Sequence, residues 1–328
     1  MASIKDVANE ANVAISTVSK VLNNYPNVSK ATRDKVNEAI KKLNFVPNAV
    51  ASALSSKKPG RVAILMNQIT LGLVDEVDMS YLSGAIPKAL ELKMEVITIF
   101  FSMLKDKSTS EIITYLKSQS VEGLVIFGLS KDEITILDVI KSGEFKTVVI
   151  DAPFVNTSTS CVWVDQYKAQ FDVAKELFKM NTVKKVLYLS GKKNSFVGEI
   201  REKAIRDICK KMKLTLGVKC AEFSEKRARD IVLKEGKDYD CVVCASDLCA
   251  IGAMRALTDM DIFRPVCGFD GISLMGYAGK QMTTVKQDFT MIAATAMEEL
   301  GKLFMGEEGR EVILPHEIVR IEYLDVIR

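Results

Sequence analysis

The sequence predicts an all-α helix-turn-helix head followed by an α/β body of two doubly wound parallel-sheet lobes. Two observations carry this prediction. Residues 1–45 hold three short segments with helical spacing of apolar residues and a tight turn between the first two. From Arg61 onward, short runs rich in Val, Ile and Leu alternate with helical segments, which is typical of parallel strands covered by helices on both faces. With 328 residues, 48% of them hydrophobic, the chain can bury the cores of two or three domains.

Three short helices and one turn make up the expected head. The first helix starts at Ser3, the turn Ala11-Asn12-Val13 follows, and the second helix covers the run Ile15–Asn23. A third helix is expected over residues 31–43, where apolar residues recur at helical spacing. In a helix-turn-helix of this kind the second helix lies in the major groove of DNA.

Positive charge is concentrated at the amino-terminal end. Residues 1–60 carry nine Lys and Arg against four Asp and Glu, whereas the whole chain has a formal charge of only +3. A basic head on a nearly neutral body is typical of a domain that contacts DNA phosphates. A solvated basic face would explain the charge alone, but the helix-turn-helix pattern favours DNA.

Residues 46–60 are expected to form a hinge helix and a linker. Ser55–Gly60 has the composition of a linker, and residues 48–54 could form about two helical turns. A helix this short is not stable alone in water, because nucleation is costly. We therefore expect it to fold against a partner, for which bound DNA is the candidate.

Residues 61–328 are expected to fold as two lobes with a ligand cleft between them. The apolar runs expected to be strands lie at residues 61–66, 94–100, 123–127, 147–150, 185–189, 218–223, 241–245 and 266–269. The first lobe is expected to span about 61–161 plus 288–315, and the second about 162–287 plus 316–328. Ligands in such folds bind at the carboxyl ends of the strands, which here places the ligand between the lobes.

Polar residues directly follow several of these runs, at the expected carboxyl ends of strands. They are Asn67, Gln68, Asp151, Ser190, Ser246, Asp247 and Asp270. Helix capping explains Asp247, because a clear helical segment follows it. Neither Asp151 nor Asp270 precedes a clear helix start, so ligand binding is favoured over helix capping for both. No glycine-rich phosphate loop follows any run, which disfavours nucleotide binding.

Composition disfavours several other classes of protein. There is no apolar run of 18 residues and no secretory signal layout, so we expect a cytoplasmic protein without membrane contact. The seven cysteines lie mostly in apolar runs, and the single histidine, His316, leaves Cys241-Val-Val-Cys244 without partners for zinc. We expect buried free thiols, no metal and no cofactor.

A series of motifs follows in order along the chain. They are Ile4-Lys5-Asp6-Val7-Ala8, Ser16-Thr17-Val18-Ser19-Lys20-Val21-Leu22-Asn23, Asn27-Val28-Ser29, Thr32-Arg33, Val46-Pro47-Asn48-Ala49-Val50-Ala51, Leu54, Gly268-Phe269-Asp270 and Thr283-Thr284-Val285-Lys286-Gln287. Through them the chain resembles, over essentially its full length, the lactose-repressor/galactose-repressor (LacI/GalR) family of bacterial transcription regulators. The resemblance implies a body like the periplasmic binding proteins and a homodimer on a pseudo-palindromic operator of double-stranded DNA.

The resemblance also implies DNA contacts in the head and the hinge. The base-reading positions are Ile15, Ser16 and Lys20, which share one exposed face of the second helix. The residues implied to contact phosphates are Thr17, Ser19, Asn23, Ser29 and Thr32, for which capping and turn chemistry is an alternative role. In the hinge, Asn48 belongs to the implied DNA-binding set and Leu54 matches the leucine that wedges into the minor groove.

Three departures from the family pattern lie in the head. Lys20 stands where most members carry Arg, and Lys cannot form the two-pronged contact that Arg makes with guanine. Asn12 replaces the usual glycine of the turn, which is tolerable because Asn accepts left-handed backbone angles. Ala14 replaces a capping serine, so the start of the second helix should be weakened.

In the body, the resemblance implies an effector site. Its residues are Asp151, Trp163, Arg201, Ser246, Asp270 and Gln287. Carboxylates and a guanidinium bind hydroxyl groups, and an aromatic ring covers the apolar face of a sugar, so a sugar is the expected effector. Trp163 is nearly as well explained as a core residue of a strand, and Ser246 stands where the family has Asn. The family's aromatic segment after the first strand is replaced by Gln68–Asp78, whose acidic residues suit either a cationic ligand or a solvated helix start.

Taken together, these features predict a DNA-binding transcription regulator, expected to be a repressor, that a small molecule in the cleft gates without catalysis. The alternative is a cytoplasmic sugar-binding protein with a vestigial DNA-binding head, against which the intact base-reading face argues. An enzyme that uses the carboxylates of Asp151 and Asp270 is conceivable but has no further support.

Overall fold

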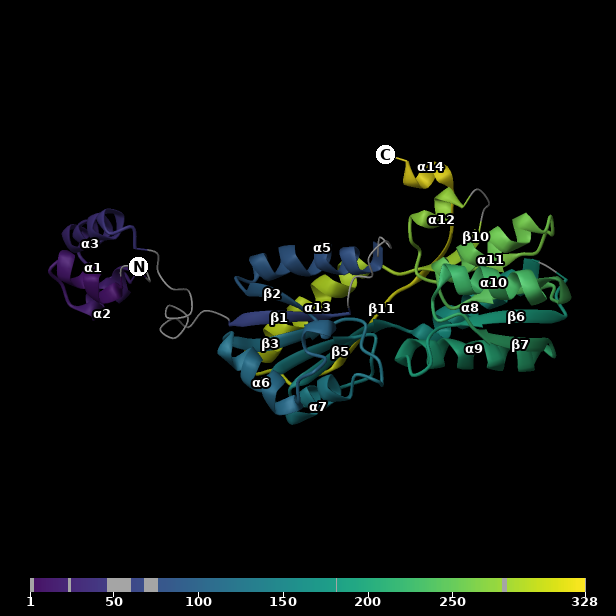
Figure 1. The fold of residues 1–328 in the computed structure, drawn as a ribbon, viewed down its shortest axis with the longest axis horizontal. Helices are drawn as coiled ribbons and strands as arrows, with labels where there is room; N and C mark the ends of the chain where they lie inside the picture. The colour runs from purple at the N-terminus through teal and green to yellow at the C-terminus, as the bar shows by residue number, and fades with distance from the viewer. Residues whose placement is uncertain are drawn as a thin grey trace.

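The computed structural model describes residues 3–22, 25–45, 60–67, 76–180, 182–278 and 282–327. These residues form a head of three helices and a body of two α/β lobes (Figure 1), as the sequence predicts. Three residues of the predicted DNA-binding set, Asn23, Asn48 and Leu54, lie outside the described residues. No helix of the described part is long and apolar enough to cross a membrane.

The head consists of α1 (Ile4–Glu10), α2 (Ile15–Leu22) and α3 (Lys30–Lys42). Ser3 and Asp6 form a capping box at the start of α1, and Ser29 caps α3. Small apolar residues from the three helices meet in a common core, namely Val7, Ala8, Ala11, Val18, Val21, Val36 and Ala39. Asn12 in the turn has a φ of 51°, which confirms the left-handed backbone expected there.

The first lobe is built on a sheet with the strand order β11-β5-β4-β3-β1-β2, all parallel. Its strands are β1 (Arg61–Met66), β2 (Glu95–Phe100), β3 (Val121–Ile126), β4 (Lys146–Ile150), β5 (Thr159–Val164) and β11 (Glu311–Leu314). One face is covered by α5 (Glu76–Glu91) and α13 (Phe289–Phe304), the other by α6 (Thr109–Ser118) and α7 (Ile134–Ser142). Cover on both faces explains the continuous apolar runs of these strands.

The second lobe is built on a sheet with the order β12-β10-β9-β8-β6-β7. Its strands are β6 (Lys185–Ser190), β7 (Thr215–Cys220), β8 (Cys241–Cys244), β9 (Val266–Cys267), β10 (Met282–Lys286) and β12 (Glu317–Ile321), the last antiparallel to β10. One face is covered by α8 (Gln166–Met180) and α9 (Phe196–Met212), the other by α10 (Glu225–Glu235) and α11 (Asp247–Asp259). The short helices α12 (Leu274–Tyr277) and α14 (Tyr323–Val326) meet through an edge-to-face contact of Tyr277 and Tyr323.

The chain passes between the lobes after β5, after β10 and after β11. Gln166, Gln287 and His316 stand at these three crossings. The first sheet includes all of β5 and so extends to Val164, slightly beyond the lobe boundary predicted at about residue 161. The helix α13 follows the second crossing and fills the core of the first lobe.

The start of α2 offers a test of the capping argument. Thr17 and Val18 donate their N–H groups to the carbonyl of Ala14, at 2.9 and 3.2 Å, but the alanine methyl group cannot accept a hydrogen bond. Ala14→Ser should let a hydroxyl accept from Thr17 and stabilise α2 by about 1 kcal/mol. Amide exchange of Thr17 and Val18 in the full chain should then slow about fivefold. Ala31→Ser, at an exposed helical position of α3, should leave these rates unchanged, and equal rates in Ala14→Ser and the wild type would contradict the argument.

Candidate DNA interface and ligand cleft

The outward face of α2 carries the predicted base-reading residues. Ile15 is 47% exposed, and Ser16 and Lys20 are exposed beside it. On the inward face, Val18 and Val21 are buried in the core of the head. A large apolar side chain held in solvent beside a lysine is available for contacts with base edges and thymine methyl groups.

The residues predicted to contact phosphates fall into two groups. Thr17 and Ser19 are half-buried on α2. At the start of α3, Thr32 donates its N–H to Ser29 Oγ at 3.2 Å, and the two hydroxyls lie 2.8 Å apart. The structure therefore shows Ser29 as the cap and Thr32 as its bonding partner, and their phosphate contacts stay a prediction.

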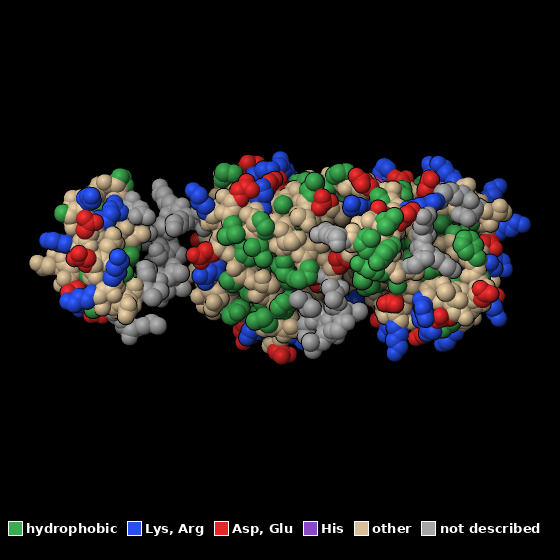
Figure 2. All heavy atoms as spheres, turned by 90° about the horizontal axis from the view of Figure 1, so that it is seen from above, with side chains coloured by type: hydrophobic (Ala, Val, Ile, Leu, Met, Phe, Trp, Pro, Cys, Tyr) green, Lys and Arg blue, Asp and Glu red, His purple; other side chains and the backbone are tan. Residues whose placement is uncertain are grey.

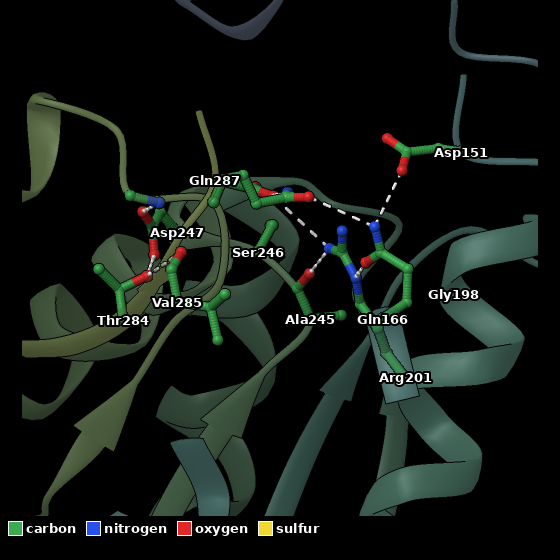
Figure 3. Close-up of polar contacts among 12 residues, drawn as sticks. Asp151, Gln166, Gly198, Arg201, Ala245, Ser246, Asp247, Thr284, Val285 and Gln287 are labelled. Atoms are coloured by element: carbon green, nitrogen blue, oxygen red, sulfur yellow. Dashed lines mark hydrogen bonds and ion pairs between the residues drawn. The ribbon is translucent and has the colours of Figure 1, made fainter. Parts of the chain in front are cut away.

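Four of the predicted effector residues meet between the lobes (Figure 3). Asp151 follows β4 of the first lobe, Asp270 and Gln287 follow β9 and β10 of the second, and Arg201 projects from α9. Arg201 Nη1 lies 3.6 Å from Asp270 Oδ1, and Gln287 Nε2 donates to the same oxygen at 3.1 Å. The carboxyl ends of the two sheets thus converge on one polar site, as parallel α/β topology requires.

Gln166, the first residue of α8, joins these residues into one network (Figure 3). Its Oε1 accepts from Arg201 Nε at 2.8 Å, and its Nε2 donates to Asp151 Oδ1 at 2.9 Å and to Gln287 Oε1 at 3.3 Å. One buried carboxamide therefore links the first lobe to the second. Sequence reasoning missed Gln166, although its place beside Trp163 and at a helix start was a usable signal.

Tyr81 on α5 is a second residue that sequence reasoning missed. Its hydroxyl donates to Asp151 Oδ2 at 3.0 Å. Its ring stacks on Phe127, with centroids 4.7 Å apart, and meets Phe289 edge to face at 5.2 Å. Tyr81 therefore brings an aromatic residue into contact with the Asp151 carboxylate of the cleft.

Trp163 and Ser246 are held by other partners. The indole of Trp163 donates to Glu311 Oε1 at 2.9 Å on the edge strand β11. Glu311 pairs with Cys161, so the indole leans toward the amino end of β5 and away from the end that faces the network. Ser246 is the N-cap of α11 and accepts from the N–H of Cys249 at 3.4 Å. Trp163 is thus a half-buried strand residue bonded to the edge strand, Ser246 is a helix cap, and ligand contacts of both stay a prediction.

Asp247 does not cap α11 as predicted, because it is the first helical residue and Ser246 takes the capping role. Its carboxylate is fully buried and accepts from the N–H groups of Gly271 and Ile272, at 2.7 and 2.9 Å. The hydroxyl of Thr284 donates to the other oxygen at 2.5 Å. Asp247 therefore organises the loop that follows Asp270.

The guanidinium of Arg201 is almost completely buried. Its Nη1 donates to the carbonyl of Ala245 at 2.6 Å, and the group lies 3.6 Å from the centre of the Phe269 ring. A buried charge is tolerated only when hydrogen bonds and an opposite charge replace its hydration. Gln166 and Ala245 accept its hydrogen bonds, the ring of Phe269 faces it, and the carboxyl group of Asp270 lies 3.6 Å away.

The two carboxylates of the network have unusual properties. Burial raises the pKa of Asp151, and it raises the pKa of Asp270 to about 8, because desolvation outweighs the attraction of Arg201. Both residues also have positive φ angles, 60° for Asp151 and 124° for Asp270. Such backbone conformations cost about 1–3 kcal/mol and cluster at ligand sites. Both features indicate a site maintained for binding rather than for stability.

The chemistry of this site is that of hydrogen bonding. Carboxylates accept, the guanidinium donates, and the two carboxamides do both, which suits a ligand rich in hydroxyl groups. The described residues contain no group of three His, Cys, Asp or Glu side chains arranged to hold a metal ion. All seven cysteines are free thiols, and burial raises the pKa of Cys209 to about 11, which keeps that thiol protonated at neutral pH.

Comparison with known proteins agrees with this geometry. Residues 3–48 match the family described as "Bacterial regulatory proteins, lacI family", and residues 79–305 match "Periplasmic binding proteins and sugar binding domain of LacI family". Catabolite control protein A of Staphylococcus aureus is 29% identical over 331 residues, and the HTH-type transcriptional regulator RegA of Clostridium saccharobutylicum is 30% identical over 338 residues. Each alignment covers 98% of both chains.

A similar fold occurs in a solved structure of the lac repressor dimer bound to operator and the anti-inducer ONPF. The TM-score is 0.79 at 21% identity, over 97% of this chain and 98% of that chain. The family matches cover the head and most of the body, and they agree with the three-helix head and the paired lobes. The chain belongs to the LacI family of bacterial regulatory proteins and is a DNA-binding transcription regulator.

Proposed function

We propose that the protein is a repressor that binds a pseudo-palindromic operator as a homodimer, and that a sugar in the cleft controls its affinity for this operator. The observation that carries the proposal is the buried network of Asp151, Gln166, Arg201, Asp270 and Gln287, which spans both lobes. A ligand that contacts both lobes favours one arrangement of the lobes over others. The exposed face of α2 supplies the DNA contacts.

The polar groups of the cleft favour a neutral ligand with several hydroxyl groups. Asp151 and Asp270 would accept hydrogen bonds from hydroxyls, and Arg201 and the two glutamines would donate to ring and hydroxyl oxygens. We infer that the site binds without catalysis. The single histidine, His316, stands at the third crossing, 3.8 Å from Asp172, and six of the seven thiols are buried. We propose that the protein acts in the cytoplasm, because its target is the DNA of the cell.

Exposed apolar side chains support a homodimer. They lie on α5, α12 and α14 and are 40–75% exposed, namely Met79, Ile86, Leu90, Leu274, Tyr277, Tyr323 and Leu324. Figure 2 shows hydrophobic side chains gathered on the side of the molecule where these helices lie. Contiguous apolar patches of this kind mark interaction surfaces. A two-fold dimer would present two heads to the two half-sites of a pseudo-palindrome.

Two measurements test the proposal. Selection of binding sites from random double-stranded DNA should recover a palindromic consensus, and recovery of none would favour a sugar-binding protein with a vestigial head. A thermal-shift screen of mono- and disaccharides should find a stabilising ligand, since a ligand at a hundred times its Kd adds about 2.7 kcal/mol. Arg201→Ala should abolish that shift, and a shift that persists would place the ligand elsewhere.

Lys20 should limit base discrimination at one position of the operator. Lys20→Arg would allow the two-pronged contact with guanine, worth about 1–3 kcal/mol of discrimination. Selected sites should therefore become richer in guanine at a single position of each half-site. Lys41→Arg, on the exposed face of α3, is the matched control and should leave the consensus unchanged. The same consensus for Lys20→Arg and the wild type would contradict a base-reading role.

Asp270 should lower the stability of the unliganded protein. Its pKa is about 8 in the folded state and about 3.8 when exposed, so between these values the folded state binds one proton more than the unfolded state. Wild-type stability should then fall as the pH rises through this range. Asp270→Asn cannot titrate, so its stability relative to the wild type should rise as the pH rises toward 8, while it binds the sugar more weakly.

Urea unfolding at about pH 5 and about pH 8 measures this difference. The advantage of Asp270→Asn over the wild type should be larger at the higher pH. Asp106→Asn, at an exposed position, is the control and should show no such trend. If the difference in unfolding free energy between Asp270→Asn and the wild type does not change with pH, the charge of Asp270 does not destabilise the folded state.

A further inference from the structure

Carboxylates from both lobes hold three consecutive backbone N–H groups. Gly271 and Ile272 donate to Asp247 Oδ2 of the second lobe, at 2.7 and 2.9 Å. Ser273 donates its N–H to Glu76 of the first lobe, at 2.8 and 3.0 Å from the two oxygens, and its hydroxyl adds a bond of 2.8 Å. The loop that contains these residues is therefore fastened to its own lobe and to the opposite lobe.

This loop begins at Asp270, a member of the ligand network. Asp270 and Gly271 both have positive φ angles, 124° and 80°. A Cβ atom at Gly271 would lie 2.6 Å from the Cα atom of Lys286, so the loop packs directly on the backbone of β10. Asp247, which binds the loop, is itself buried and held by Thr284. Asp247 therefore cannot easily move with the loop when Asp270 is displaced.

The contact between Glu76 and Ser273 lies within a larger junction of the lobes. Val77, the next residue of α5, packs against the hydrophobic cores of both lobes. The same helix carries Tyr81, whose hydroxyl binds Asp151 in the ligand network. Helix α5 therefore meets the network directly at Tyr81 and through the loop at Glu76.

We propose that the loop Asp270–Ser273 transmits ligand occupancy at Asp270 to the position of the first lobe through Glu76. Glu76 is a positioning residue in this scheme and does not touch the ligand. Hydrogen bonds from a ligand to the Asp270 carboxylate shift Asp270 and with it the loop. Asp247 anchors the middle of the loop, and Ser273 passes the displacement to Glu76 on α5. The ligand-free and ligand-bound arrangements of the lobes then differ in the hydrogen bonds between Glu76 and Ser273. The inference rests on the proposed function, because it takes Asp270 to be a ligand contact.

Hydrogen exchange of the full chain, without sugar or DNA, tests this proposal. Glu76→Ala should speed exchange of the Ser273 amide about tenfold, because a hydrogen bond to a carboxylate protects it. Glu76→Gln keeps one acceptor oxygen and should give a smaller increase. Glu91→Gln is the matched control on the same helix, since Glu91 pairs with Lys88 within the first lobe at 2.8 Å, and it should leave the Ser273 rate unchanged.

A double-mutant cycle tests the link to Asp270. Asp270→Asn should change the exchange rate of Ser273 when Glu76 is present and leave it unchanged in the Glu76→Ala background. The proposal is overturned if Glu76→Ala behaves like Glu91→Gln, or if Asp270→Asn has the same effect with and without Glu76. If Glu76→Ala does not fold, Glu76→Gln takes its place in the cycle. A saccharide could stabilise the protein while the effects of Asp270→Asn and Glu76→Ala on the Ser273 exchange rate simply add. That result would overturn the link through Glu76 and leave the proposed function standing.

Discussion

The arrangement of the cleft depends on the buried guanidinium of Arg201. A charge in this position must be bonded on every side, because an unpaired buried charge costs several kcal/mol. Its partners come from separate elements: the carbonyl of Ala245 follows β8, Asp270 and the ring of Phe269 follow β9, and Gln166 opens α8. Arg201 thereby fixes several strand ends of the second lobe relative to one another, and through Gln166 it fixes Asp151 of the first lobe.

The same site carries unfavourable terms that the rest of the fold has to offset. Two carboxylates are largely removed from water, which raises their pKa values, and both have left-handed backbone angles. A ligand that donates hydroxyl groups would replace the hydration that these carboxylates have lost. Large apolar cores on both faces of each sheet supply the stability that the cleft lacks. Trade-offs of this kind between stability and function are common at binding sites.

The sequence was sufficient to predict that Asp151 and Asp270 lie in the cleft. Each follows an apolar run, and the carboxyl ends of parallel strands meet at one edge of a sheet. Gln166 and Tyr81 could not be found in this way. Their contacts depend on where the chain crosses between lobes and on how α5 packs, which apolar periodicity does not reveal. Trp163 shows a related limit: β5 is buried on both faces, so its pattern does not tell which way a given side chain points. Short capped helices were easier to predict, because capping and turn chemistry are local.

In the proposed mechanism, the ligand of the cleft and the operator affect each other's binding. The most direct measurement is the anisotropy of a labelled operator titrated with the protein, at rising concentrations of the saccharide that the stability screen identifies. The saccharide should change the Kd for the operator by some 5–150-fold, and the operator should change the Kd for the saccharide by the same factor. An operator affinity that is the same at zero and at saturating saccharide would contradict it.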